Sequence, residues 1–262
     1  MPDPSSASQA GYRRVTAVLA HGVPETSAVW GPLRSHLRRA DVAALRLPGF
    51  GCPRPEGFGA TKEEYVTWLV GELERLRADG PLDLVGHDWG GALVVRVVSV
   101  RPDLVRSWAT DAAGVGDAGF EWHEVARIWQ TPGAGEDFFE QQLARPAEER
   151  AGVFKQFGVS HDDAVAMAGS LDRTMAGCIL ALYRSAVDVG RQWAPEFSDV
   201  AAPGLVVVPS EDPFLSAESA RNAARAARAR LVDLAGRGHW WMLQDPAQGA
   251  AMLERFWESL DQ

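Results

Sequence analysis

An aspartate stands between glycines in the stretch LVGHDWGG, residues 84–91. The spacing Gly86-x-Asp88-x-Gly90 follows one apolar run and precedes another, residues 92–100. This pattern predicts a tight turn from a strand into a helix, where missing Cβ atoms let the two elements approach and expose the central side chain. An ionised carboxylate there can attack a saturated carbon without a general base, leaving an alkyl ester that water can cleave. An acyl substrate would give a mixed anhydride instead, so we expect a leaving group on an sp³ carbon.

The glycine-flanked aspartate resembles the nucleophile turn of α/β-hydrolases, in the branch that contains epoxide hydrolases and haloalkane dehalogenases. The resemblance runs from about residue 14 to residue 260. HGVPETSAVW at 21–30 is similar to the oxyanion loop of that family, with its H-G-x-P pattern. VVVPSEDPF at 206–214 is similar to the segment that carries the acid, and GRGHWWMLQDP at 236–246 to the loop that carries the histidine.

The resemblance implies a role for each matching residue. Asp88 would be the nucleophile, and His239 the base that deprotonates water. Asp212 would orient His239 and stabilise its charged form. The backbone N–H groups of Val23 and Trp89 would hold the oxyanion while the ester is hydrolysed. The family chemistry needs no cofactor and no metal, and we expect none.

Two neighbouring acids remain alternatives to Asp212. Glu211 precedes it directly, and Asp111 ends a predicted strand. We expect His21 to anchor the oxyanion loop at the edge of the pocket, and His87 to have a structural role of the same kind. Asp88 could also be no more than the cap of the following helix.

Epoxide and halide chemistry differ in what stabilises the leaving group. An alkoxide needs a proton donor, and Tyr183 resembles the later of two ring-opening tyrosines of epoxide hydrolases. The region of the earlier tyrosine reads GEDFFEQQ, residues 135–142, and has none. A halide needs rigid N–H donors, which Trp89 could supply, with Trp122 or Trp129 as a second donor.

We therefore expect an epoxide hydrolase that acts on a small apolar substrate. A haloalkane or haloacid dehalogenase is the first alternative, and an esterase-like or catalytically idle binding protein is the second. Val23 offers no side-chain donor for a halide, which favours the epoxide. Trp122, Trp129 and Trp240 are expected to line the pocket with His21.

Short apolar segments must supply the strands that position these residues. The runs that predict strands are 14–20, 42–47, 82–86, 104–110, 204–208 and, more weakly, 229–234. Segments of helical periodicity lie between or after them, at 61–78, 90–101, 215–228 and 246–260. This alternation predicts an α/β fold with a mostly parallel sheet covered by helices on both faces.

The alternation stops between residues 114 and 200, where the sequence is aromatic and helical in pattern. We expect this block to be a helical cap inserted into a core formed by residues 1–113 and 201–262, lying over the carboxyl edge of the sheet. Only about 20 residues precede His21, so the sheet should be shortened at its N-terminal edge.

Composition excludes several classes of partner. The 262 residues include 26 Lys+Arg and 35 Asp+Glu, and the net charge of −9 argues against nucleic acid or an anionic membrane. Cys52 and Cys178 have no metal or redox spacing and are expected to be reduced thiols. The N-terminus does not resemble a secretory signal, so we expect a cytoplasmic protein. The oligomeric state is left open.

Overall fold

Six parallel strands form one sheet in the computed structural model, which describes residues 15–78, 80–198 and 200–262. The strand order is β2-β1-β3-β4-β5-β6. The strands are β1 (Thr16–Ala20), β2 (Val42–Ala44), β3 (Leu82–Gly86), β4 (Ser107–Thr110), β5 (Gly204–Pro209) and β6 (Arg230–Leu234). The predicted α/β architecture with a parallel sheet is confirmed.

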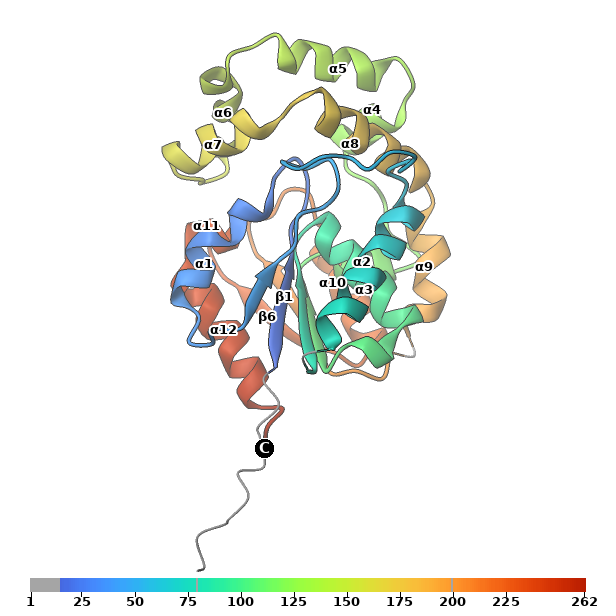
Figure 1. Cartoon of the computed structure of the whole chain (residues 1–262), viewed down its shortest axis with the longest axis vertical. Coiled ribbons are helices and arrows are strands. Elements are labelled where there is room, and N and C mark those ends of the chain that lie inside the picture. The colour runs from blue at the N-terminus through green and yellow to red at the C-terminus, as the bar shows by residue number, and fades with distance from the viewer. Residues whose placement is uncertain (1–14, 79, 199) are drawn as a thin grey trace, which may run out of the picture.

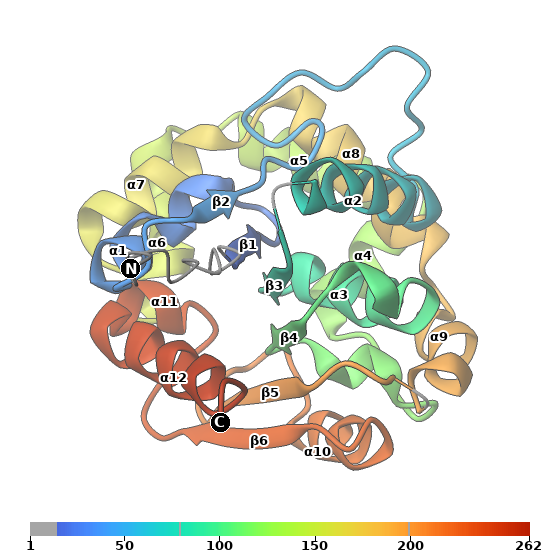
Figure 2. The same cartoon turned by 60° about the horizontal axis from the view of Figure 1, so that its bottom comes forward.

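Alternate residues along the strands face two separate layers of helices. Val18, Leu84 and Trp108 lie in one register row and belong to the larger apolar core, whereas Leu19 and Val85 in the next row belong to the smaller one. Figure 2 shows α1 and α12 on one side of the sheet and α2, α3 and α10 on the other. The helices of these layers are α1 (Gly31–His36), α2 (Lys62–Arg77), α3 (Trp89–Val100), α10 (Ala217–Ala226), α11 (Trp241–Gln244) and α12 (Pro246–Glu258). Burial of both faces explains why the strands are apolar runs rather than alternating sequences.

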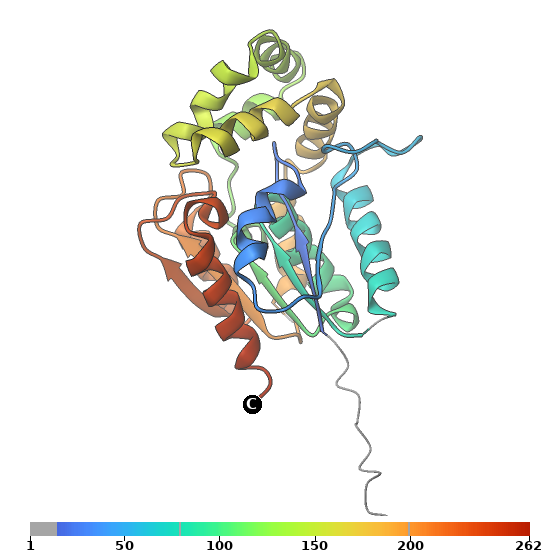
Figure 3. The same ribbon diagram turned by 60° about the vertical axis from the view of Figure 1, so that its left-hand side comes forward.

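Five helices lie above the carboxyl ends of the strands (Figures 1 and 3). They are α4 (Glu124–Gln130), α5 (Ala134–Leu143), α6 (Ala147–Gln156), α7 (His161–Ser170) and α8 (Arg173–Ser185), and we call them the cap helices. The sixth helix of the predicted insertion, α9 (Val189–Phe197), packs beside α3 instead. Phe197 of α9 lies against Trp108 of β4, with ring centroids 5.4 Å apart.

The described part of the sheet ends at β2, a strand of three residues that pairs with β1 alone. No further strand lies beyond it in the described ranges, as expected for a sheet shortened at this edge. Three short 3-10 helices, η1 (Ser27–Trp30), η2 (Pro102–Leu104) and η3 (Ala113–Gly116), join elements of the core. The predicted strand at 104–110 begins later, at Ser107, because η2 takes up its first residue.

The turn from β3 into α3 is close to the limit of steric packing. Asp88 has φ 49° and ψ −122°, a backbone conformation that L-residues rarely adopt. A Cβ atom on Gly86 would lie 2.4 Å from the carbonyl oxygen of Gly90, and one on Gly90 would lie 2.2 Å from that of Ala20. The glycines are therefore required by close backbone contacts on both sides of Asp88.

Among the described residues, no single helix is both long and apolar enough to cross a membrane. The adjacent helices α7 and α8 reach the required length and composition only together, and they are bent by 82°.

Candidate active site

Asp88 is placed where three parts of the chain meet. Its Oδ1 accepts a hydrogen bond of 2.9 Å from the backbone N–H of Val23. Its Oδ2 lies 3.8 Å from Nε2 of His239, and the side chain is 13% exposed. The Asp88 side chain makes no capping hydrogen bond to α3, which leaves the simple helix-cap interpretation without support. One carboxylate oxygen is thus held by the loop after β1, and the other faces the histidine.

Burial raises the pKa of Asp88 from 3.8 to about 6. The nearby charges of His239 and His87 and the N–H of Val23 oppose this shift, but they do not cancel it. The carboxylate is therefore ionised at neutral pH and poorly solvated, a state that favours nucleophilic attack.

His239 lies between Asp88 and Asp212. Its Nδ1 is 2.8 Å from Oδ2 of Asp212, while Oδ1 of Asp212 accepts the N–H groups of Phe214 (2.8 Å) and Leu215 (3.2 Å). Burial lowers the pKa of His239, but the charge and hydrogen bond of Asp212 outweigh it, so the pKa is raised above 6.5. The structure brings together Asp88, His239 and Asp212 in the order that a nucleophile, base and acid require.

Neither of the two alternative acids is the carboxylate that holds Nδ1 of His239. Oδ2 of Asp111 is 2.6 Å from Nδ1 of His87, and Oδ1 of Asp111 accepts the backbone N–H of Asp88 (2.9 Å). Glu211 is exposed, whereas Asp212 is the carboxylate on Nδ1 of His239.

The oxyanion loop is fixed by His21, which is fully buried. Its Nδ1 is 2.8 Å from the carbonyl oxygen of Gly22, and its Nε2 accepts the N–H of Leu47 (3.1 Å). One ring nitrogen is used within the loop and the other by the segment after β2, so His21 anchors the loop and presents no free nitrogen to a ligand. The following peptide bond, Val23–Pro24, is cis.

The two predicted oxyanion donors differ in their present partners. The N–H of Val23 already holds Oδ1 of Asp88. Trp89 is the first residue of α3, where backbone N–H groups have no partner within the helix. The Val23 N–H thus contacts the Asp88 carboxylate directly, while the role of the Trp89 N–H as a second oxyanion donor stays a prediction.

A buried charged network lies next to the nucleophile, and the sequence reasoning missed its first member, Glu25. Nε2 of His87 is 3.0 Å from Oε1 of Glu25, and its Nδ1 faces Asp111. Burial lowers the pKa of His87, but Asp111 and Glu25 outweigh it and raise the pKa well above 6.5. Trp241 Nε1 donates to Asp111 (2.7 Å). The only sequence signal for Glu25 was its position directly after the H-G-x-P motif.

Glu25, His87 and His239 each place a possible metal-ligand atom within 4.8 Å of the other two. Oε1 of Glu25 lies 3.0 Å from Nε2 of His87, and Nδ1 of His239 faces Asp212. The predicted absence of a metal stays a prediction.

An aromatic group from core and cap surrounds Tyr183, which is buried on α8. Its ring centroid lies 5.4 Å from that of Trp89, 5.1 Å from Trp122 and 4.9 Å from Trp129. Burial, and then the charge of Asp88, raise the pKa of Tyr183 well above 10, while the indole of Trp89 acts in the opposite direction. The hydroxyl therefore stays protonated near the nucleophile.

The tryptophans around Tyr183 are not equivalent as donors. Trp122 Nε1 donates to the carbonyl oxygen of Ala186 (2.9 Å), so it is not free for a ligand. The indole nitrogens of Trp89 and Trp129 are buried and have no hydrogen-bond partner among the described residues. A buried donor without a partner costs about 1–3 kcal/mol, which a bound acceptor would recover.

Two aromatic neighbours complete the surroundings. Phe139 stacks on Trp129, with ring centroids 5.6 Å apart. Phe139 belongs to the segment 135–142, which corresponds to the earlier ring-opening tyrosine of epoxide hydrolases. Trp240 is buried, its ring 4.9 Å from that of His239 and 5.2 Å from that of Phe154 on α6. Trp240 therefore joins the histidine loop to the cap helices.

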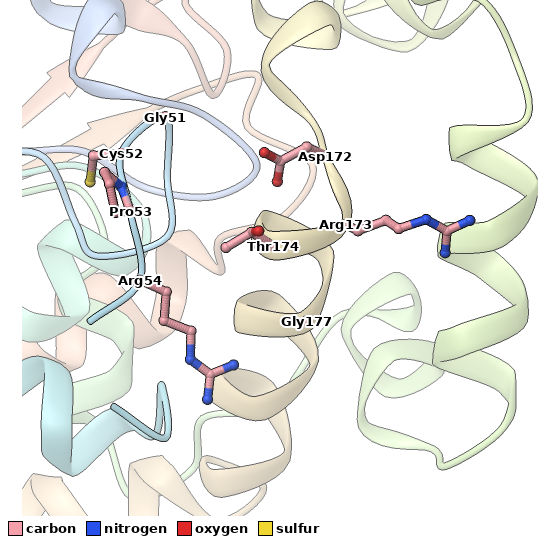
Figure 4. Close-up of a pocket in the computed structure, with 8 residues that line it drawn as sticks. All are labelled: Gly51, Cys52, Pro53, Arg54, Asp172, Arg173, Thr174 and Gly177. Atoms are coloured by element: carbon pink, nitrogen blue, oxygen red, sulfur yellow. The ribbon is translucent and has the colours of Figure 1, made fainter. Parts of the chain in front are cut away.

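A groove of about 690 Å³ lies apart from these residues (Figure 4). The loop before α2 lines one side of it with Cys52 and Arg54, and the start of α8 lines the other with Asp172 and Thr174. Asp88, His239 and Asp212 do not line it.

Comparison with known proteins places this geometry in a family. The model of the Alpha/beta hydrolase family matches residues 17–252. Lipase LipV of Mycobacterium tuberculosis is 36% identical over 95 residues, which are 36% of this chain and about a third (35%) of the lipase. (E)-2-((N-methylformamido)methylene)succinate hydrolase of Acinetobacter baylyi is 25% identical over 224 residues, covering 80% of this chain and 78% of the relative.

Solved structures show the same fold. E-2-(acetamidomethylene)succinate hydrolase has a TM-score of 0.69 at 20% identity, over 94% of this chain and 92% of the other. Haloalkane dehalogenase DbeA from Bradyrhizobium elkani has a TM-score of 0.71 at 19% identity, over 95% and 92%. With the six-stranded sheet and a family model that spans nearly all of the described residues, this chain belongs to the alpha/beta hydrolase family.

Proposed function

We propose that this hydrolase cleaves a bond at a saturated carbon through an ester on Asp88, and that its substrate is an epoxide. The observation that carries the proposal is the position of the Asp88 carboxylate. Val23 holds one oxygen through its N–H at 2.9 Å, and the other oxygen lies 3.8 Å from His239 Nε2. A serine hydrolase needs its histidine to activate the nucleophile, but an ionised carboxylate leaves His239 free for water.

In the first step, Oδ2 of Asp88 attacks an epoxide carbon and the carbon–oxygen bond of the ring breaks. The electron pair stays on the departing oxygen, which takes the proton of the Tyr183 hydroxyl. The raised pKa of Tyr183 suits this role, because the donor must remain protonated until a strongly basic alkoxide develops. The indole N–H of Trp89, which faces the Tyr183 hydroxyl, would stabilise the same oxygen or the tyrosinate.

In the second step, His239 Nε2 takes a proton from water and the hydroxide adds to Cγ of the Asp88 ester. The N–H groups of Val23 and Trp89 stabilise the resulting oxyanion. Its collapse breaks the bond between the ester oxygen and Cγ, the departing oxygen takes the proton of the added hydroxyl group, and the diol leaves Asp88 as a carboxylate. The proton on His239 returns through the product hydroxyl to Tyr183. Asp212 holds His239 and stabilises its charged form throughout.

A haloalkane dehalogenase is the second candidate, because two indole N–H groups near Tyr183 lack partners. A halide accepts such hydrogen bonds and needs no proton, so Trp89 and Trp129 would suffice to stabilise it. Only the first step differs: the carbon–halogen bond breaks and halide leaves. Hydrolysis of the ester then gives an alcohol.

A panel of terminal epoxides and alkyl bromides tests the proposal with the His239→Gln variant. We expect this variant to form the ester but not to hydrolyse it, so intact-protein mass spectrometry should show a stoichiometric adduct that peptide mapping places on Asp88. His161→Gln, a change on an exposed cap histidine, is the matched control and should turn over normally.

The products decide between the two candidates. Adducts and diols from epoxides support the first, and halide release supports the second. No adduct from either class of compound, with no turnover by the wild-type protein, would leave an idle fold and overturn the proposal.

A further inference from the structure

His123 is a partly buried histidine that the proposed reaction does not use. It precedes α4 and caps that helix, since its Nδ1 accepts the backbone N–H of Ala126 at 3.2 Å. An accepting ring nitrogen carries no proton, so the proton of the neutral ring is on Nε2. Burial, and then the nearby charge of His239, lower the pKa of His123 to about 4. At neutral pH His123 is therefore an uncharged donor with a fixed tautomer.

The ring of His123 lies on the histidine side of the candidate active site. Its centroid is 5.3 Å from that of Phe214, which in turn is 5.1 Å from that of His239. The ring centroids of Trp122 and Trp129 each lie 6.4 Å from that of His123. The charges that act on His123 are those of His239 and Asp212.

Tyr183 has the same two tryptophans, Trp122 and Trp129, as ring neighbours, but it also contacts Trp89 beside the nucleophile, with ring centroids 5.4 Å apart. The groups that act on its hydroxyl are Asp88 and Trp89. A carbon bound to Oδ2 of Asp88 would therefore have its leaving group toward Tyr183 and could direct another substituent toward Phe214 and His123.

We propose that His123 is a specificity-determining residue, whose Nε2–H donates a hydrogen bond to an uncharged oxygen of the substrate beyond the reacting carbon. An ether, hydroxyl or carbonyl oxygen has the required acceptor. This inference rests on the proposed function, because it concerns a substituent of the carbon that Asp88 attacks.

A carboxylate is not the expected acceptor at this position. Asp88 and Asp212 already place two carboxylates beside the single imidazole of His239. A third negative charge in the same poorly solvated region would be repelled by both. A neutral oxygen avoids this cost and still satisfies the imidazole N–H.

The test must separate hydrogen bonding to substrate from capping of α4. His123→Ser keeps a good helix cap but is too short to replace the Nε2–H, whereas His123→Ala loses both. Thermal unfolding of the two variants reports the cap, and only His123→Ala is expected to be destabilised. Their kinetics then report the substrate contact.

The probes are phenyl glycidyl ether and 4-phenyl-1,2-epoxybutane, which differ by an ether oxygen in place of a methylene. Should the protein prefer halides, 2-phenoxyethyl bromide and 3-phenylpropyl bromide form the same pair. We expect His123→Ser to lower kcat/KM for the ether about 3- to 10-fold, as for the loss of one neutral hydrogen bond, and to leave the methylene compound unchanged. Comparing each substrate between wild type and variant cancels the inherent reactivity of the ether.

Equal losses for both compounds, or no loss for either, would overturn the role of His123. The proposed function is judged separately, by whether the wild-type protein turns over the methylene compound and whether Asp88→Asn abolishes that turnover. If neither pair is turned over at all, the proposed function fails and the inference falls with it.

Discussion

The turn at Asp88 and the cap helices above it hold their polar groups in different ways. At the turn, the candidate nucleophile, base and acid each have a close hydrogen-bonding partner. Val23 binds one oxygen of Asp88, Asp212 binds His239, and Asp111 binds the backbone N–H of Asp88. In the cap, aromatic rings surround Tyr183, its hydroxyl faces the indole of Trp89, and the indole N–H of Trp129 lacks a partner among the described residues.

This difference separates two parts of the reaction. The core fixes the groups that must act in the same geometry on every substrate, while the cap offers donors whose partners arrive with the substrate. Changes at the turn should therefore abolish turnover or folding. Changes in the cap should alter which compounds are accepted and at what rate.

The largest expected effect is that of Asp88→Asn. An amide is a poor nucleophile, so kcat should fall by about 10⁴-fold or more, in the range seen when a catalytic triad loses a member. The Asp88→Asn variant should nevertheless be more stable to unfolding than the wild-type protein. The raised pKa of Asp88 means that its charged form, dominant above pH about 6, destabilises the fold, by up to about 3 kcal/mol at pH 7.

Steady-state kinetics and urea unfolding at pH 7 measure both effects on one sample. Asp137→Asn, a change on an exposed cap residue, is the control and should alter neither kcat nor the free energy of unfolding. An Asp88→Asn variant that keeps substantial activity would show that the turn does not carry the chemistry.

A pair of glycine substitutions tests the steric side of the turn. Gly90→Ala puts a Cβ 2.2 Å from a backbone oxygen that cannot move away, so we expect a loss of about 3 kcal/mol in unfolding free energy or failure to fold. Gly71→Ala, in α2 with nothing within 4 Å of the new Cβ, should instead stabilise the protein by up to about 1 kcal/mol. Equal behaviour of the two variants in urea unfolding would contradict the close approach at the turn.

Tyr183→Phe tests the cap. Removing the proton donor should slow epoxide opening about 10²-fold. Release of bromide should change little, since a halide needs no proton. Stopped-flow measurement of ester formation in the His239→Gln background isolates this step from hydrolysis. Tyr65→Phe, which removes a hydroxyl bound to the carbonyl oxygen of Pro48, is the control and should leave the rate of opening unaffected.

The pH profile separates the two steps with smaller changes. Attack requires ionised Asp88, so kcat/KM should be flat above pH about 6 and fall tenfold per pH unit below it. Hydrolysis requires neutral His239, whose pKa is raised above 6.5. When hydrolysis limits turnover, kcat should therefore begin to fall at a higher pH than kcat/KM does as the pH is lowered. Identical profiles for kcat and kcat/KM would argue that a single group controls both steps.

The sequence predicted the core better than the cap, for a physical reason. Strands and helices of the core follow from apolar runs and glycine-flanked turns, and their packing fixes where Asp88 lies. The loop motifs also pointed to Val23, Asp212 and His239; in the structure Val23 and His239 lie next to Asp88, and Asp212 next to His239. Local patterns sufficed because each of these residues lies within a few positions of a strand end.

Contacts between distant segments were not predictable in this way. Trp122 and Trp129 look alike in sequence, yet only the first bonds to the carbonyl oxygen of Ala186. Glu25 was overlooked because its partner, His87, comes from a different strand end. The helix α9 was expected in the cap, but an amphipathic segment does not reveal which surface it will cover, and α9 packs on α3.

The origin of the oxygen in the product tests the central claim most directly. A single turnover is run with enzyme in excess over epoxide in H₂¹⁸O, and the diol and the Asp88 peptide are analysed by mass spectrometry. Attack by Asp88 predicts a first diol without ¹⁸O and one ¹⁸O atom in the Asp88 carboxylate. A first diol that carries ¹⁸O, with Asp88 unlabelled, would show that water attacks the substrate directly and would contradict the account.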